Sequence, residues 1–162
     1  NFNLTSSPER WARANLYNQR RGPDETRLVD LGGWSFAHNL LSMTGTFTRQ
    51  PFVSADGSVV CVFNGEIYNF REIQGRLRAS GHRLASESDS ECIPHLYEQY
   101  GPDLVHQLRG MFSIAVWDSG ERTLLLARDR VGKKPLYYFE DGSRLWFASE
   151  LKALLVNPRV PR

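Results

Sequence analysis

The chain has 162 residues, a length that suits one domain large enough to bury a hydrophobic core. Hydrophobic residues make up 41% and charged residues 23%, which is typical of a soluble globular protein and excludes an intrinsically disordered chain. A net charge of +2 carried by scattered basic residues, together with the lack of a long apolar run, argues against nucleic-acid-binding and membrane-spanning proteins.

The first predicted elements are a helix and a strand. Ser7-Pro8-Glu9 can cap and open a helix, which continues to about Arg21 and is ended by Gly22-Pro23-Asp24. The alternation of side chains over residues 34–38 then predicts a strand, and residues 40–43 follow it as an apolar segment.

The next predicted elements surround an Asn-Gly pair. Residues 58–63 are a β-branched and aromatic run that predicts a strand, and Asn64-Gly65 is predicted to end this strand in a tight backbone turn. Asn69 is predicted to cap a helix over residues 70–78. Residues 88–91 supply the cap and acidic first turn of a further amphipathic helix.

Hairpin-linked strands dominate the second half of the chain. We expect a short helix over residues 103–108, strands over 112–117, 123–128, 135–139 and 144–148, and a last helical turn over 150–155. Many hairpin-linked strands with a few helices between them predict an α+β fold with antiparallel sheets and helices outside.

The Asn64-Gly65 pair carries the first functional hypothesis. The Asn64 side-chain NH2 and the Gly65 backbone N–H are two neighbouring hydrogen-bond donors, and two fixed donors aimed at one point can stabilise a developing oxyanion. The alternative is a plain β-hairpin turn, for which Asn-Gly is the strongest short-range signal.

Motifs along most of the chain closely resemble the glutaminase domain of the asparagine synthetase-type class II glutamine amidotransferases. The stretches that carry the resemblance are residues 21–24, 37–38, 50–51, 63–69, 88–91, 108–112, 127–138 and 148–154. The resemblance implies an N-terminal-nucleophile hydrolase fold, a four-layer α/β/β/α sandwich with two antiparallel sheets. It also implies that residues 1–156 form the glutamine amidotransferase domain and that residues 157–162 begin a linker to a synthetase domain.

The resemblance implies hydrolysis of L-glutamine, or a related amide, to supply ammonia. The ammonia would pass to a C-terminal synthetase domain, which would bind ATP and Mg²⁺; no cofactor or metal is expected in the glutaminase domain itself. The family leaves a homodimer open and makes aspartate the default nitrogen acceptor. Two cysteines without disulfide or metal-ligand spacing fit a reducing, cytoplasmic compartment.

The family's site residues map onto a few positions of this chain. The resemblance makes Asn64 and Gly65 the oxyanion hole, and Glu66 and Asp89 the partners of the substrate's α-amino group. The alternative for Asp89 is simple helix capping. The family's nucleophile is a cysteine at the mature N-terminus, whose own α-amino group serves as the base.

The nucleophile is the first departure from the family pattern. Residue 1 is Asn1, and we expect neither Cys61 nor Cys92 to replace the missing cysteine, because both lie inside predicted elements. We therefore expect the sequence to be a truncated, cleaved or partial form of a chain that carries the cysteine, in preference to a natural start at Asn1.

The carboxylate clamp is the second departure. The arginine that binds the glutamine α-carboxylate in the family stands at the position of Leu40, within a substrate-binding stretch that continues through Leu41, Ser42, Met43 and Thr44. Leucine cannot balance a carboxylate, so we expect weakened or altered binding unless Arg49, the nearest cation by sequence, compensates. Two hypotheses follow: an ammonia-supplying glutaminase domain, and a catalytically silent domain that serves as a scaffold.

Overall fold

The computed structural model describes residues 8–30, 34–41, 49–54, 56–142 and 144–161. Two compact units share the chain: Asn1–Met43 with Pro135–Arg162, and Thr44–Lys134. None of the helices in the described ranges has both the length and the apolar character that crossing a membrane requires. The prediction of one domain over residues 1–156 and a linker over 157–162 stays a prediction.

The first unit combines two antiparallel strand pairs with two helices. Its elements are α1 (Pro8–Gln19), β1 (Glu25–Asp30), β2 (Ser35–Leu40), β7 (Tyr137–Glu140), β8 (Leu145–Ala148) and α4 (Leu151–Leu154). Strand β1 pairs with β2, and β7 pairs with β8 in the predicted hairpin. The sequence did not predict β1, because its charged residues obscure the alternation of more and less exposed positions along it.

A ring contact and an ion pair link separate elements of the first unit. Phe36 of β2 packs against Phe147 of β8, with ring centroids 5.6 Å apart. At the ends of the two helices, Arg21 Nη1 lies 3.0 Å from Glu150 Oε1. Phe36 and Leu154 are both almost fully buried. The strand pair β1–β2 is thereby tied to β8 within the same unit.

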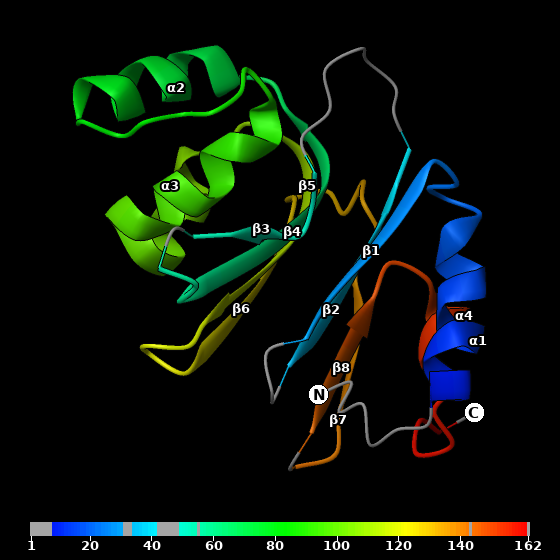
Figure 1. Cartoon of the computed structure of the whole chain (residues 1–162). Coiled ribbons are helices and arrows are strands. Elements are labelled where there is room, and N and C mark those ends of the chain that lie inside the picture. The colour runs from blue at the N-terminus through cyan, green and yellow to red at the C-terminus, as the bar shows by residue number, and fades with distance from the viewer. Residues whose placement is uncertain (1–7, 31–33, 42–48, 55, 143, 162) are drawn as a thin grey trace. The chain divides into compact units, whose positions relative to one another are not determined.

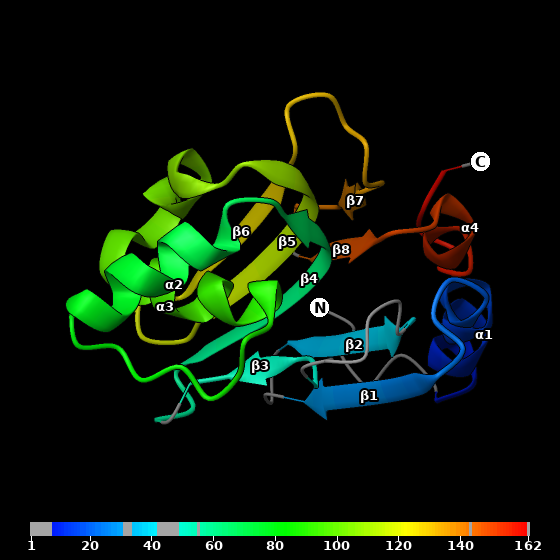
Figure 2. The ribbon, with the colours of Figure 1, turned by 90° about the horizontal axis from the view of Figure 1, so that it is seen from above.

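The second unit is one four-stranded antiparallel sheet with helices on one face (Figures 1 and 2). Its strand order is β3-β4-β5-β6. Its elements are β3 (Phe52–Val53), β4 (Val59–Ile67), α2 (Phe70–Ala79), the 3₁₀ helix η1 (Asp89–Glu91), α3 (Cys92–Tyr100), the 3₁₀ helix η2 (Gly101–Gln107), β5 (Gly110–Asp118) and β6 (Thr123–Arg128). The helices lie in the segment that connects β4 to β5.

Alternate residues of β4 and β5 form the core of the second unit with the apolar sides of α2 and α3. The buried members are Val59, Cys61, Phe63, Ile67, Ile73, Leu77, Cys92, Ile93, Leu96, Tyr97, Leu104, Leu108, Phe112, Ile114 and Val116. This two-residue period places Phe63 and Ile67 on the helix side and turns Asn64 and Glu66 to the opposite side of the sheet.

The predicted turn at Asn64-Gly65 is wrong. Strand β4 continues through both residues to Ile67, and Gly65 stands opposite Phe112 of β5. A Cβ atom on Gly65 would lie 2.1 Å from the Met111 carbonyl oxygen, so only glycine permits this approach of the strands. Gly110 allows the same approach from β5, because a Cβ there would lie 2.2 Å from the Glu66 carbonyl oxygen.

Asn69 occupies the predicted position before α2 but does not cap it through its side chain. Its Nδ2 donates to the Gln107 carbonyl oxygen at 3.0 Å, and its Oδ1 accepts from the Arg109 N–H at 2.9 Å. The side chain therefore joins the end of β4 to the chain that enters β5. Competition from these backbone groups explains why the capping hydrogen bond is missing.

Candidate functional site

The edge of β4 that faces away from β5 carries a row of backbone N–H groups. The Phe63 N–H donates to Gln50 Oε1 at 2.7 Å, and the Ile67 N–H donates to Asp89 Oδ2 at 2.8 Å. Beyond the residues paired with β3, this edge presents the N–H groups of residues 63, 65 and 67, and two side chains from distant parts of the chain occupy the first and last of these three.

The N–H of Gly65 points to the same edge. Successive N–H groups of a strand alternate between its two sides, so residues 63, 65 and 67 share one direction. On the β5 side, Phe112 uses its own backbone groups for Asp129: its N–H donates to Asp129 Oδ2 at 3.3 Å, and its carbonyl accepts from the Asp129 N–H at 2.8 Å. The Gly65 N–H therefore stands between two bound neighbours, each about 7 Å along the strand.

Asn64 and Glu66 flank Gly65 in β4, and Asp89 binds the next N–H group on the same edge. The Asn64 and Glu66 side chains share the sheet face opposite the helices, and Glu66 is exposed. Asp89 is half-buried and opens η1, yet no side-chain capping hydrogen bond forms at the start of η1 or α3. Its carboxylate instead accepts a hydrogen bond from the Ile67 N–H. The position of the Asp89 side chain is therefore set by this bond and not by helix capping.

Leu40 ends β2 in the first unit. The Asp24 N–H donates to the Leu40 carbonyl oxygen at 3.0 Å, and Gly22 packs so closely that an added Cβ would lie 2.2 Å from the Asn39 carbonyl oxygen. The segment 21–24 therefore fixes the backbone at position 40, which gives this motif a structural role. The side chain of Leu41 is 51% exposed, whereas Ser42, Met43 and Thr44 lie outside the described residues.

Arg49 is exposed and immediately precedes Gln50. Because the Gln50 side chain is buried and bound to Phe63, the backbone beside Arg49 is fixed next to the edge of β4. Arg49 thus directly precedes a residue whose side chain is bound to this edge. Its role as a compensating cation stays a prediction.

Neither cysteine has the properties of a nucleophile. Cys61 is fully buried in β4, and burial raises the pKa of its thiol. Burial, with the carboxylates of Asp89 and Glu91, raises the pKa of Cys92 to about 12. Since the thiolate is the reactive form, both thiols are protonated and inert near neutral pH.

Sequence reasoning assigned no role to Gln50 and Asp129. The signal for both was present, because each is a polar residue inside a motif of the family resemblance and lies beside apolar or basic residues. Asp129 is only 5% exposed and accepts hydrogen bonds from the N–H groups of Phe112, Lys133 and Lys134. Burial by itself would raise the pKa of Asp129, but these backbone N–H groups together hold it below its ordinary value.

Comparison with known proteins gives one consistent family. The sequence pattern of the glutamine amidotransferase domain matches residues 3–162. A glutamine-hydrolyzing asparagine synthetase 2 of Bacillus subtilis (strain 168) is 43% identical over 143 residues, which are 88% of this chain and 19% of the relative. A glutamine-hydrolyzing asparagine synthetase 2 of Oryza sativa subsp. japonica is 40% identical over 84% of this chain and 23% of the relative. The chain thus spans about a quarter or less of these relatives.

A solved structure has the same fold. Glutamine phosphoribosylpyrophosphate (PRPP) amidotransferase from B. subtilis, complexed with ADP and GMP, matches with a TM-score of 0.70 over 92% of this chain and 40% of that chain. At 19% sequence identity this likeness concerns the fold alone. It confirms the predicted α+β, N-terminal-nucleophile hydrolase class. The family pattern over residues 3–162, the asparagine synthetase relatives and this fold show that the chain belongs to the glutamine amidotransferase domain family.

Proposed function

We propose that this domain hydrolyses glutamine and supplies ammonia within a larger, ATP-dependent, asparagine synthetase-like amidotransferase. The observation that carries the proposal is the Gly65 N–H, directed to the edge of β4 between the bound N–H groups of Phe63 and Ile67. A donor fixed in this way, with the Asn64 amide beside it, is the arrangement that stabilises the oxyanion of acyl transfer. Glu66 and Asp89, at the same end of β4, are the proposed partners of the substrate's ammonium group.

The proposed nucleophile is a cysteine at the mature N-terminus of the full-length protein. The raised pKa values of Cys61 and Cys92 support this assignment, because neither buried thiol can serve. A primary amine with a pKa of about 8 on the same residue would take the thiol proton. Intact mass and N-terminal sequencing of the protein from its host test the assignment directly.

The central experiment measures glutamate release from glutamine by the full-length protein. We expect Asn64→Ala to lower kcat about 100-fold, the usual loss for one oxyanion donor. Gln99→Ala is the matched control, because Gln99 is an exposed amide on α3 away from β4. No glutamate release by the wild-type protein would contradict the proposal and leave the scaffold role.

The substitution at position 40 leads us to propose weakened or altered binding of the glutamine α-carboxylate. Restoring the cation by Leu40→Arg should then lower KM for glutamine about tenfold, equivalent to ~1.4 kcal/mol. If Arg49 compensates instead, Arg49→Ala should abolish glutamine binding and Leu40→Arg should leave KM unchanged. The exposed Arg71 of α2 gives a control, since Arg71→Ala removes a cation elsewhere in the same unit.

The loop after β6 is the proposed contact with the synthetase domain. Arg128 Nε donates to the Lys134 carbonyl oxygen at 2.6 Å, and Asp129 accepts the backbone N–H groups of Lys133 and Lys134. The described hydrogen bonds of the loop thus use the backbone groups of the two lysines, while Val131 at its tip is 89% exposed. Lys133→Glu should uncouple ammonia transfer from glutamine hydrolysis and leave the thermal stability unchanged. Coupling that survives this change would remove the contact from the proposal.

The remaining parts of the proposal concern assembly and compartment. The synthetase domain would bind ATP and Mg²⁺, with aspartate as the default nitrogen acceptor and a homodimer as the assembly. The two buried thiols fit the reducing cytoplasm. Size-exclusion chromatography with light scattering on the full-length protein measures the assembly state.

A further inference from the structure

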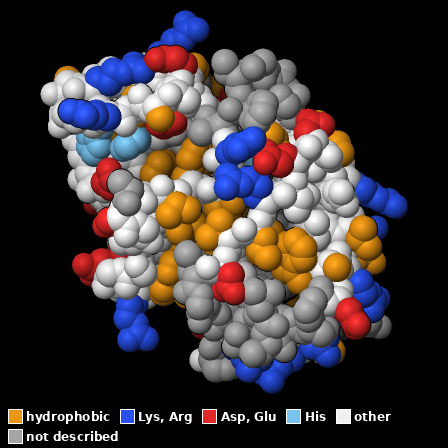
Figure 3. Space-filling view, in the orientation of Figure 1, with side chains coloured by type: hydrophobic (Ala, Val, Ile, Leu, Met, Phe, Trp, Pro, Cys, Tyr) orange, Lys and Arg blue, Asp and Glu red, His pale blue; other side chains and the backbone are white. Residues whose placement is uncertain are grey.

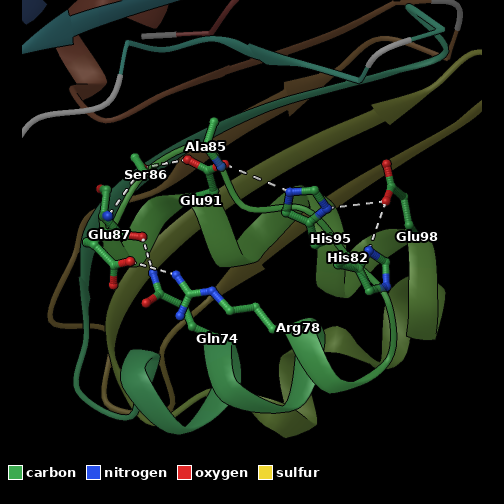
Figure 4. Close-up of polar contacts among 10 residues, drawn as sticks. Gln74, Arg78, His82, Ala85, Ser86, Glu87, Glu91, His95 and Glu98 are labelled. Carbon is green, nitrogen blue, oxygen red and sulfur yellow. Dashed lines mark hydrogen bonds and ion pairs between the residues drawn. The ribbon is translucent and has the colours of Figure 1, made fainter.

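Two histidines and a glutamate converge on the helical side of the second unit (Figure 4). His82 follows α2, whereas His95 and Glu98 lie one turn apart on α3. His82 Nδ1 lies 3.5 Å from Glu98 Oε2, and His95 Nδ1 lies 3.4 Å from the same oxygen. One donor atom from each of the three residues lies within 4.8 Å of the other two.

The spacing of these atoms matches the coordination sphere of a small divalent cation. Zn²⁺ binds imidazole nitrogen and carboxylate oxygen at about 2.0–2.2 Å, which separates tetrahedral donors by about 3.4 Å. Within the described residues, His95 Nδ1 is buried and has no hydrogen-bond partner, although Glu98 Oε2 lies 3.4 Å away. This nitrogen therefore lacks the partner that buried polar atoms normally have.

Glu91 provides a second layer behind His95. Its carboxylate is held by the Ala85 N–H and the Ser86 hydroxyl, and its Oε1 lies 4.0 Å from His95 Nε2. A carboxylate that faces the far nitrogen of a histidine favours the tautomer whose other nitrogen is available to a metal. His95 therefore has a carboxylate on the side opposite the convergence point.

The surface of the unit leaves room for solvent ligands. The side chains of His82 and His95 are 19% and 20% exposed, and that of Glu98 is 40% exposed. Histidine side chains are visible at the surface over α2 and α3 in Figure 3. Three protein ligands with one side open to water are the number that zinc sites with a water ligand use.

We propose that His82, His95 and Glu98 bind a divalent transition metal of the Zn²⁺ class. The metal joins the start of the α2–α3 connection to α3. The other end of that connection is already fixed, because Gln74 Nε2 donates to the Ser88 carbonyl oxygen at 3.1 Å and Arg78 pairs with Glu87. The connection leads directly into Asp89, so a metal at its start would stiffen the segment that carries this carboxylate to Ile67.

The test is Zn²⁺ titration of the full-length protein, stripped of metal by a chelator, in competition with a chromogenic chelator. We expect the wild-type protein to bind Zn²⁺ at least tenfold more tightly than the His95→Gln and Glu98→Gln variants. His106→Gln is the matched control, since His106 is an exposed histidine of η2 outside the cluster, and it should bind Zn²⁺ like the wild type. Glu98→Gln, at the more exposed position, keeps the comparison valid if His95→Gln fails to fold.

Thermal unfolding gives an independent readout. Ligand that binds the folded state alone raises Tm, so Zn²⁺ should raise the Tm of the wild type and of His106→Gln but not that of His82→Asn. Co²⁺ in place of Zn²⁺ should give visible absorption bands that the same variant loses. A Zn²⁺ affinity that differs less than tenfold between wild type and Glu98→Gln would overturn the proposal and leave the cluster as an ion-pair contact between the connection and α3.

Discussion

Asp89 and Asp129 of the second unit both accept backbone N–H groups of the central strands, but they do so to different extents. Asp129 is nearly buried and receives three N–H groups, from Phe112, Lys133 and Lys134. Asp89 is half-buried and receives the N–H of Ile67 at 2.8 Å. The two carboxylates lie beside neighbouring strands of one sheet, β4 and β5.

The difference separates a structural carboxylate from one that can still take a ligand. A carboxylate has about four acceptor positions. Asp129 uses three of them for backbone N–H groups of β5 and of the loop after β6, and it thereby fixes this loop. Asp89 fixes one end of the row on β4 and, among the described residues, accepts the one N–H group of Ile67. We therefore expect changes at Asp129 to affect stability first and changes at Asp89 to affect substrate binding first.

The largest expected effect is a loss of stability when the close pairing of β4 and β5, the strands beside the two carboxylates, is disturbed. Gly65→Ala places a Cβ 2.1 Å from the Met111 carbonyl oxygen, well inside van der Waals contact, and should cost about 3 kcal/mol or more of unfolding free energy. Denaturant unfolding measures the loss. Gly75→Ala is the control, because Gly75 is exposed in α2 with open space around its Cβ position and should gain about 0.5–1 kcal/mol. Equal effects at the two glycines would contradict the close approach of β4 and β5.

Asp129→Asn should have the next largest effect. The amide replaces one acceptor oxygen by a donor that faces N–H groups, so we expect a loss of about 2–3 kcal/mol. Chemical denaturation of the wild type and the variant gives the difference. Asp103→Asn is the control, because Asp103 is an exposed carboxylate of η2. A variant within 0.5 kcal/mol of the wild type, on the order of surface substitutions, would show that Asp129 does not hold the loop.

The pH dependence sharpens the assignment for Asp129. Its folded pKa is lowered, so its contribution to stability is fully present above the unfolded pKa of about 3.9 and is lost as the pH falls through the folded pKa. The unfolding free energy of the wild type should therefore converge with that of Asp129→Asn below this range, with a slope of at most about 1.4 kcal/mol per pH unit. A stability difference between the two proteins that persists unchanged to pH 2 would contradict this.

The smallest expected effect on stability belongs to Asp89→Asn. The amide oxygen can still accept the Ile67 N–H, so the variant should lose only about 1 kcal/mol. Its KM for glutamine should instead rise about tenfold, because an amide no longer balances the substrate's ammonium group. Differential scanning calorimetry and the glutamate-release assay measure the two effects. A loss of stability as large as that of Asp129→Asn, with KM unchanged, would make Asp89 a purely structural residue.

Local sequence patterns predicted the helices and strands well where apolar residues recur at the spacing of a helix or a strand. The hairpin of β7 and β8 around Asp141-Gly142, the strands β5 and β6, and the helices α1 to α4 were predicted from alternation, helical periodicity and turn residues, although the predicted side-chain caps of α2 and α3 do not form. Strand β1 was missed because its charged side chains mask the alternation. The continuation of β4 through Asn64-Gly65 was missed because it depends on Gly110, a residue far away in the sequence.

The site was predictable only as far as the family motifs reach. Resemblance pointed to Asn64, Gly65, Glu66 and Asp89, and the structure places Asp89 against the end of the same strand. The packing of Gly65 against Met111 also means that glycine at this position is required by the sheet itself. An intact Asn-Gly-Glu sequence is therefore weaker support for catalysis than the direction of the Gly65 N–H.

Side-chain contacts that depend on the path of the chain could not be predicted from the sequence. Asn69 could be placed before α2, but its bonds to Gln107 and Arg109 require the return of the chain toward β5. His82, His95 and Glu98 follow no recognisable ligand spacing, because the α2–α3 connection brings the first histidine to α3. Such sets become visible only when the connection between helices is known.

The insertion of residues 68–109 between two paired strands has a consequence for folding. Strands β5 and β6 are joined by a short turn, whereas β4 must find β5 across α2, η1, α3 and η2. Loop-closure entropy makes such a distant pairing slower than a local hairpin. We expect the β5–β6 hairpin to form early and β4 to join it late, so that mutations in β4 chiefly accelerate unfolding.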